Sequence, residues 1–240
     1  MSQFEKNIFP TPILVGDVDN TSIIDNICKL AYDFKANAKD CRLISSSWHL
    51  GAKSSNQEDF NRDGVTTFDS VPDLFYTEPW QQAAYFILDT ALDMITSVYD
   101  NKNKVFTLQN LWTSVYPENG YVPMHIHSNA LLSGTFYAKA LPSCGNLVFQ
   151  DPAYLLKTMY VHDLAEFPSV AVRHEQEVKT GRMVLFPGWL PHESLPNKSG
   201  DDRIIIGFNI NMLNKDEFES TFVNSADDLK LRKPIVYRYL

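Results

Sequence analysis

Two histidines separated by one residue are the feature of this sequence that most directly suggests chemistry. His125 and His127 stand in the short segment MHIH, whose residue types favour a β-strand. Residues i and i+2 of a strand point to one face, so both imidazoles are predicted side by side, with Met124 and Ile126 on the other face. Two imidazoles on one face suit a divalent metal ion. Such pairs also occur in ordinary cores and surfaces, so the metal hypothesis needs further support.

That support comes from a histidine and an arginine later in the chain. The apolar segment GRMVLFPGWLPH (181–192) ends in His192, and the segment RIIIGFNINM opens with Arg203 after the turn NKSGDD. We expect these two residues on neighbouring antiparallel strands. Arg203, Ile205 and Gly207 share one predicted face while the opposite face is also apolar, so both faces are predicted to be buried and the arginine to point into a lumen.

Helices followed by short strands are the elements that must position these residues. Apolar spacing predicts helices over 21–34 and 78–99, and the polar stretch 37–77 predicts a long loop with short extended pieces, a lid or a linker. From Val105, β-branched and aromatic runs between turn residues predict an all-β sandwich or barrel. The expected strands are VFTLQNLWTSVY, MHIH, LLSGTFYAKA, GNLVFQD, EQEVK, RMVLFP and RIIIGFNINM.

Composition limits the class of protein and its partners. The chain has 240 residues, 44% of them hydrophobic, and 21 Lys+Arg against 29 Asp+Glu give a net charge of -8. No broad basic surface is therefore expected, which argues against nucleic acid as a partner. Cys28, Cys41 and Cys144 lack CxxC spacing, which favours neither disulfides nor a thiolate metal site. Without a signal peptide or a long apolar run, a cytoplasmic protein with no membrane partner is expected.

Five motifs in order resemble those of the 2-oxoglutarate and Fe(II) dependent dioxygenases, especially oxygenases of bacteria and phages. They read HIH at 125–127, SGTFY at 133–137, GNLVFQDP at 145–152, GRMVLFPGWLPH at 181–192 and RIIIGFN at 203–209. The resemblance spans about residues 108–212. It implies a double-stranded β-helix (jelly roll) in a bacterial or phage-infected cell. The catalytic core is expected over 105–213, with an N-terminal helical extension over 1–104 packed outside it. A tail over 214–240 is expected to wrap the core, and the three parts form one structural domain.

The same resemblance implies a ligand set for Fe(II) and for the cosubstrate 2-oxoglutarate. His125 and His192 would ligate the metal, and Arg203 would bind the distal carboxylate through a charge-assisted contact that guanidinium geometry allows to be bidentate. The family usually has HxD or HxE, whereas His127 stands at the carboxylate position. One possible ligand set is therefore three histidines. In a second, the motif is shifted by two residues, so that His127 is the histidine ligand and Asn129 stands in the carboxylate position. In a third, Asp151 supplies the carboxylate ligand. The arginine is often followed two residues later by serine, and here that residue is Ile205.

A stripe of hydroxyl groups predicts the remaining cosubstrate contacts. Ser133, Thr135 and Tyr137 share one face of their strand, and hydroxyls inside a barrel need polar partners. A dicarboxylate would satisfy them, so Tyr137 and then Thr135 are expected cosubstrate contacts. The alternative is a stripe that faces solvent. Asn110, Trp112, Ser114 and Tyr116 share one face of the first barrel strand and are candidates to line the pocket, although Trp112 is expected in the core. His49, His162 and His174 are expected in loops or solvent.

Three hypotheses about function follow. The first is an Fe(II) and 2-oxoglutarate dependent oxygenase that hydroxylates a small molecule or peptide. The second is a cupin-like enzyme with three histidine ligands that does not use 2-oxoglutarate, which the missing carboxylate and Ile205 favour. The third is a non-catalytic barrel that binds a partner. The substrate is open, and so is the possibility of a homodimer.

Overall fold

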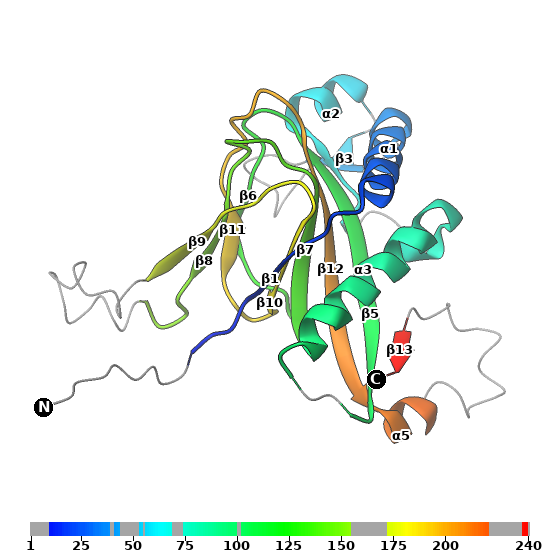
Figure 1. Ribbon diagram of the computed structural model, residues 1–240. Helices are drawn as coiled ribbons and strands as arrows, with labels where there is room; N and C mark the ends of the chain where they lie inside the picture. The colour runs from blue at the N-terminus through cyan, green and yellow to red at the C-terminus, as the bar shows by residue number, and fades with distance from the viewer. Residues whose placement is uncertain are drawn as a thin grey trace, which may run out of the picture.

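A computed structural model of the chain shows two antiparallel β-sheets facing each other, with helices on the outer face of the larger sheet (Figure 1). The structure describes residues 10–38, 41–43, 53–54, 56–68, 74–99, 102–154, 172–220 and 237–239. Among these residues, no helix is long and apolar enough to cross a membrane. The mainly β jelly-roll class expected from the sequence is confirmed.

The larger sheet positions the arginine and the hydroxyl stripe. Its described strands follow the order β1-β10-β7-β12-β5-β4-β2-β3, with β13 also paired to β5. Strand β12 lies between β7 and β5 and pairs with both over most of its length. The strand bounds are β1 Leu14–Asp17, β10 Arg182–Pro187, β7 Leu132–Lys139, β12 Arg203–Asn214, β5 Lys104–Tyr116, β4 Val65–Thr66, β2 Cys41–Leu43, β3 Lys53–Ser54 and β13 Tyr237–Tyr239.

The smaller sheet carries two of the three histidines singled out above. Its order is β6-β11-β8-β9, with β6 Val122–His125, β11 His192–Ser194, β8 Leu147–Gln150 and β9 Arg173–Gln176. His192 thus lies in this sheet, whereas Arg203 begins β12 in the other one. The expectation that the two residues occupy neighbouring paired strands is wrong: the turn between them crosses from one sheet to the other.

Helices α1 (Thr21–Asn37) and α3 (Glu78–Thr96) confirm the two predicted helices and cover the outer face of the larger sheet (Figure 1). The side chain of Asn20 caps α1 by accepting a hydrogen bond from the Ile23 amide at 3.2 Å, and Pro79 occupies the first turn of α3. Both helices bury an apolar stripe on the sheet. The residues that form this outer core include Ile27, Ala31, Ile87, Ala91, Ile204, Ile206 and Phe208.

A second core fills the space between the two sheets. Its buried side chains come from strands of both sheets and include Tyr116, Tyr137, Leu147, Phe149, Phe186 and Ile205. Because alternate residues of β12 enter different cores, Ile204 and Ile206 face the helices while Arg203 and Ile205 face the interior of the barrel. The packing therefore agrees with the prediction that Arg203 points into the lumen.

Two parts of the chain differ from the expected loops and strands. The polar stretch 37–77 contains a helix, α2 (Gln57–Asp63), where the sequence predicts a loop. Asn56 caps it, and Phe60 is its one buried residue, so an apolar stripe that could have revealed the helix is missing. Strand β9 begins before the expected segment EQEVK. A 3-10 turn (η2, Leu74–Tyr76) precedes α3, and the tail forms α5 (Lys215–Phe218) and strand β13 within its described residues.

Candidate metal and cosubstrate site

Three histidine side chains converge at one end of the barrel interior. One ring nitrogen of each of His125, His127 and His192 lies within 4.8 Å of the others. The ring centroids are 4.2 Å apart for His125 and His192, 5.0 Å for His125 and His127, and 5.1 Å for His127 and His192. Three imidazole nitrogens this close together are a ligand set suited to iron or another divalent transition metal.

Backbone pairing explains how the histidines meet. His125 ends β6 and is directly paired with His192 on β11. His127 lies beyond the end of β6, so the prediction that both residues of the HxH pair belong to one strand is wrong. The His127 amide instead donates to the carbonyl of Gly188 at 2.8 Å, which holds the segment after β6 against the turn before β11. Its ring still reaches the cluster.

Hydrogen bonds set the tautomers of two of these rings. Nδ1 of His125 lies 2.8 Å from the Pro123 carbonyl oxygen, and Nδ1 of His192 lies 2.8 Å from the Leu190 carbonyl oxygen. A carbonyl can only accept, so each Nδ1 carries a proton and each Nε2 offers a lone pair. A backbone carbonyl bonded to the far nitrogen is the usual support of a metal-binding imidazole.

Burial also keeps the imidazoles of His127 and His192 neutral. Burial, with a smaller contribution from the neighbouring His125, lowers the pKa of His127 from 6.5 to about 3. For His192, burial and then the charges of His125 and His127 lower the pKa well below 6.5, although the bond to Leu190 opposes this. Neutral imidazole is the form that ligates a metal, so the cluster is prepared for an ion at neutral pH.

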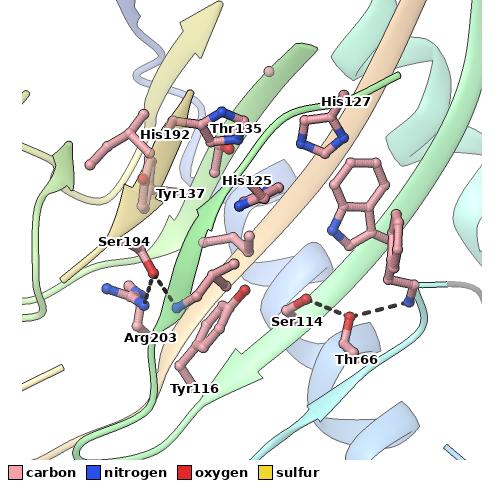
Figure 2. Close-up of a pocket in the computed structure, with 16 residues that line it drawn as sticks. Thr66, Ser114, Tyr116, His125, His127, Thr135, Tyr137, His192, Ser194 and Arg203 are labelled. Carbon is pink, nitrogen blue, oxygen red and sulfur yellow. Dashed lines mark hydrogen bonds between the residues drawn. The ribbon is translucent and has the colours of Figure 1, made fainter. Parts of the chain in front are cut away.

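The histidine cluster opens into a pocket that ends at Arg203 (Figure 2). The empty space at the pocket, including solvent at its open mouth, is about 680 Å³. In Figure 2, His127 lies at one end, and Arg203 and Ser194 lie at the other. The described lining residues are Thr66, Phe68, Trp112, Ser114, Tyr116, Val122, His125, His127, Gly134, Thr135, Tyr137, Leu147, His192, Ser194, Arg203 and Ile205.

Arg203 is a buried cation held by uncharged groups. It is 1% exposed, and no carboxylate among the described residues forms an ion pair with it. Its Nη1 donates to the carbonyl oxygens of Cys144, Gly145 and Leu195 at 2.6, 3.0 and 3.1 Å, and its planar group stacks on the ring of Tyr116. Burying a charge is costly unless it is compensated. The unneutralised guanidinium therefore suits an anionic ligand in the pocket.

A glycine turn allows these carbonyl groups to converge. Gly145 has φ of +87°, a left-handed conformation that side chains disfavour. A Cβ at this position would lie 2.1 Å from the Leu195 carbonyl oxygen, one of the acceptors of Arg203. Only glycine lets the turn approach β11 closely enough to surround the guanidinium.

Two phenols and a threonine stand between the ends of the pocket. Tyr137 and Thr135 on β7 line the pocket, as does Tyr116 on β5. Burial raises the pKa of both tyrosines, against the opposing effect of Arg203, so both phenols keep their protons and can donate hydrogen bonds. The prediction that the Ser133, Thr135 and Tyr137 stripe faces the interior agrees with this arrangement, because Ser133 is buried as well.

Trp112 belongs to the pocket wall instead of the core where it was expected. Its ring lies over Gly207, where a Cβ would come within 2.2 Å of Trp112 Cε2. The ring also stacks on His127 with centroids 5.5 Å apart and meets Phe68 edge to face at 5.1 Å. The missing side chain at position 207 thus gives the indole its place beside the histidines.

The alternative ligands from the sequence lie elsewhere. Asn129 and Asp151 are not among the described residues that line the pocket. Asn129 has φ of +64°, and its carbonyl accepts a bond from Asn211, whereas the Asp151 carboxylate caps a turn by accepting from the Ala153 amide. His174 is exposed on β9, as expected, and His49 and His162 lie outside the described residues.

Ser194, Thr66 and Phe68 are among the lining residues that are not predicted for the pocket from the sequence. Ser194 follows His192 by two residues on β11, and the alternation of strand residues could have placed both side chains on the inner face. Thr66 and Phe68 come from the polar stretch that was expected to be a loop. Thr66 reaches the pocket because β4 pairs with β5, and its hydroxyl lies 2.7 Å from that of Ser114. No local pattern announces this pairing.

Comparison with known proteins relates the part of the chain that carries this site to a family model and to solved structures. Residues 110–209 match a family model described as "Putative 2OG-Fe(II) oxygenase". A Pseudomonas putida prolyl-4-hydroxylase is similar in structure, with a TM-score of 0.51, 14% identity, and coverage of 84% of this chain and 94% of that chain. The carbocyclase SnoK from nogalamycin biosynthesis, described as non-heme and alpha ketoglutarate dependent, has a TM-score of 0.54, 12% identity, and coverage of 94% and 92%.

HygX from Streptomyces hygroscopicus, solved with nickel, 2-oxoglutarate and hygromycin B, has a TM-score of 0.50, 13% identity, and coverage of 84% and 83%. No curated protein sequence matches the chain. At these identities the solved structures establish the fold, and the family model adds the type of activity. Over residues 110–209 the chain is therefore similar to the 2-oxoglutarate and Fe(II) dependent oxygenases, which are oxidoreductases that use a ferrous ion and 2-oxoglutarate.

Proposed function

We propose that the pocket is the active site of a hydroxylase. Its substrate would be a small molecule or peptide, and the carbon that is hydroxylated would belong to an uncharged group. His125, His127 and His192 would hold the ferrous ion, and Arg203 would attract the 2-oxoglutarate dianion. One observation carries the proposal: three clustered imidazoles and a buried guanidinium without a counterion among the described residues line the same pocket. The donor set fits the metal, and the unneutralised cation fits the cosubstrate.

Iron and 2-oxoglutarate, once bound, supply the activation of dioxygen and the oxidative decarboxylation of 2-oxoglutarate to succinate. The protein's residues orient the cosubstrate and exclude water. The protonated phenol of Tyr137 would donate to a carboxylate of the cosubstrate, and Thr135 stands beside it on the same face of β7. The buried strands around Arg203 keep the surroundings of the anion apolar, which strengthens its attraction to the guanidinium.

The opposite wall supports an uncharged reacting group. Thr66, Phe68 and Trp112 form this wall, and Arg203 is the only side chain with a permanent charge among the described lining residues. Within the described lining, a charged substrate group here would find no charged partner other than the arginine needed by the cosubstrate. The aromatic faces of Phe68 and Trp112 instead suit an apolar carbon skeleton.

The test is anaerobic reconstitution with Fe(II) followed by 2-oxoglutarate. We expect a weak visible charge-transfer band in the wild type and its loss in His192→Ala. An unchanged band in that variant would contradict the ligand assignment. Iron binding without a band would favour the three-histidine enzyme that does not use 2-oxoglutarate, and failure to bind iron would contradict the proposed active site.

A further inference from the structure

The hydroxyl of Ser194 is held by two hydrogen bonds that it accepts. The Val122 amide donates to Ser194 Oγ at 2.9 Å, and Nη2 of Arg203 donates to the same oxygen at 3.0 Å (Figure 2). A hydroxyl has two lone pairs and one proton. Both lone pairs are therefore used, and the proton must point away from Val122 and Arg203.

No acceptor for that proton exists among the described residues. Ser194 lines the pocket and follows His192 by two residues on β11. The side chains of both residues therefore face the interior of the barrel. A donor with its lone pairs engaged and its proton directed toward a cavity is arranged for an acceptor ligand. An anionic oxygen is the strongest such acceptor.

The hydrogens of Arg203 are mostly engaged by the protein. Nη1 has two hydrogens and three carbonyl acceptors, and Nη2 donates to Ser194 and, at 3.5 Å, to the carbonyl of Gly120. A ligand carboxylate cannot take a bidentate contact on both Nη atoms without displacing these carbonyl groups. The guanidinium nevertheless lies one hydrogen bond behind the Ser194 hydroxyl, and its donation polarises that hydroxyl as a stronger donor.

We propose that Ser194 donates the direct hydrogen bond to the distal carboxylate of 2-oxoglutarate, with Arg203 as the positive charge behind it. This inference rests on the proposed function of the pocket. It also explains how the chain does without a serine two residues after the arginine: Ile205 occupies that position and packs in the inner core, and the hydroxyl comes from β11 of the opposite sheet.

The experiment compares two ligands on the Fe(II) protein under anaerobic conditions. 2-Oxoglutarate and 2-oxopentanoate have the same carbon chain, but only the first carries a distal carboxylate. In Ser194→Ala, we expect the dissociation constant of 2-oxoglutarate to rise by about ten- to a hundredfold, the range for a hydrogen bond to a charged group. The dissociation constant of 2-oxopentanoate should stay within about twofold.

Companion variants separate this role from a structural one. Ser194→Thr keeps the hydroxyl and should restore 2-oxoglutarate affinity, whereas Ser194→Cys keeps the size and the acceptor but weakens the donor and should bind less tightly than wild type. Ser199→Ala is the matched control, because its hydroxyl bonds to Asn197 and Asp201 in the next turn and does not line the pocket. It should leave both constants unchanged.

Several outcomes would overturn the inference. Wild-type affinity for 2-oxoglutarate in Ser194→Ala or Ser194→Cys would remove the proposed hydrogen bond, and equal weakening of both ligands would show general damage to the pocket. If the wild type itself fails to bind 2-oxoglutarate, the proposed function fails first. If the wild type binds 2-oxoglutarate but the serine variants do not show the expected dissociation constants, the proposed role of Ser194 fails while the proposed function stands.

Discussion

His192 pairs directly with His125 across strands β11 and β6, and their ring centroids lie 4.2 Å apart. The pairing brings together two histidines that are far apart in the sequence, and it continues on the other side of β11, where His192 is paired with Phe149 of β8. His192 is therefore fixed by strands on both sides. Among the described residues, His127 is held instead by a backbone bond to Gly188 and by ring contacts with Trp112 and the other two histidines.

Replacing each candidate third ligand distinguishes the alternatives left open by the sequence. We expect His127→Ala to weaken Fe(II) binding strongly, and His127→Asp to retain it because a carboxylate can also ligate iron. Asn129→Ala and Asp151→Ala should bind Fe(II) as the wild type does, since neither residue lines the pocket. Anaerobic calorimetric titration measures the Fe(II) affinity of each variant. If Asp151→Ala lost Fe(II) binding and His127→Ala kept it, the assignment of the third ligand would be reversed.

The metal-free protein should lose stability when the pH falls below about 6.5. Burial lowers the pKa of His127 to about 3, whereas the unfolded chain titrates near the ordinary value of 6.5. Between these values the unfolded state binds more protons, so the free energy of unfolding decreases as the pH falls. From about pH 7.5 to about pH 5 we expect a loss of about 1–2 kcal/mol from this residue.

Urea unfolding of the metal-free protein at several pH values measures this loss. His127→Gln is the control variant and should show a shallower dependence over the same range. An identical slope in wild type and variant would show that His127 does not resist protonation in the folded state. The carboxylate of Asp17 does not confuse the result, because its pKa is lowered by bonds to Arg182 and Lys179 and its contribution is lost only in stronger acid.

The contact between Gly207 and Trp112 should appear as coupling in a double-mutant cycle. Gly207→Ala places a Cβ 2.2 Å from Trp112 Cε2, so the indole must move, at a cost of about 1–3 kcal/mol. In a Trp112→Ala background the same substitution should cost little or nothing. Denaturant unfolding of the four proteins gives the coupling energy, and additive costs would show that the two positions do not interact.

The turn at Gly145 should control affinity for 2-oxoglutarate more than affinity for iron. Gly145→Ala strains a residue with φ of +87° and forces the turn away from Leu195, which disrupts the carbonyl groups around Arg203. Gly200→Ala is the matched control: it also has positive φ, +75°, but nothing lies within 4 Å of an added Cβ. Each left-handed alanine costs about 1–2 kcal/mol of stability.

Thermal unfolding and anaerobic titrations compare the two glycine variants. Weaker 2-oxoglutarate binding only in Gly145→Ala, with unchanged Fe(II) binding in both, is the expected result. Equal 2-oxoglutarate affinity in the two variants would mean that the carbonyl groups around Arg203 do not position it for the cosubstrate.

Local sequence patterns determined the elements and the orientation of many side chains. Helical spacing gave α1 and α3 close to their observed bounds, because each helix buries one apolar stripe on the sheet. Strand alternation placed Arg203, Thr135 and Tyr137 on inner faces, since the two-residue period holds wherever both faces of a sheet are buried. The histidine pair and the apolar segment ending in His192 pointed to a metal site. The domain bounds, the cytoplasmic location and the possible homodimer stay predictions.

Tertiary structure alone decided which of these residues meet. The crossing of the chain between sheets separates His192 from Arg203, yet it brings Ser194 within hydrogen-bonding distance of Arg203. Pairing of β4 with β5 delivers Thr66 to the pocket from a stretch with no periodic pattern. Register between distant strands, and the packing of an indole over a glycine, depend on contacts between segments far apart in the chain. Local composition cannot encode such contacts, because their energies arise only when the two sheets and the outer helices have packed together.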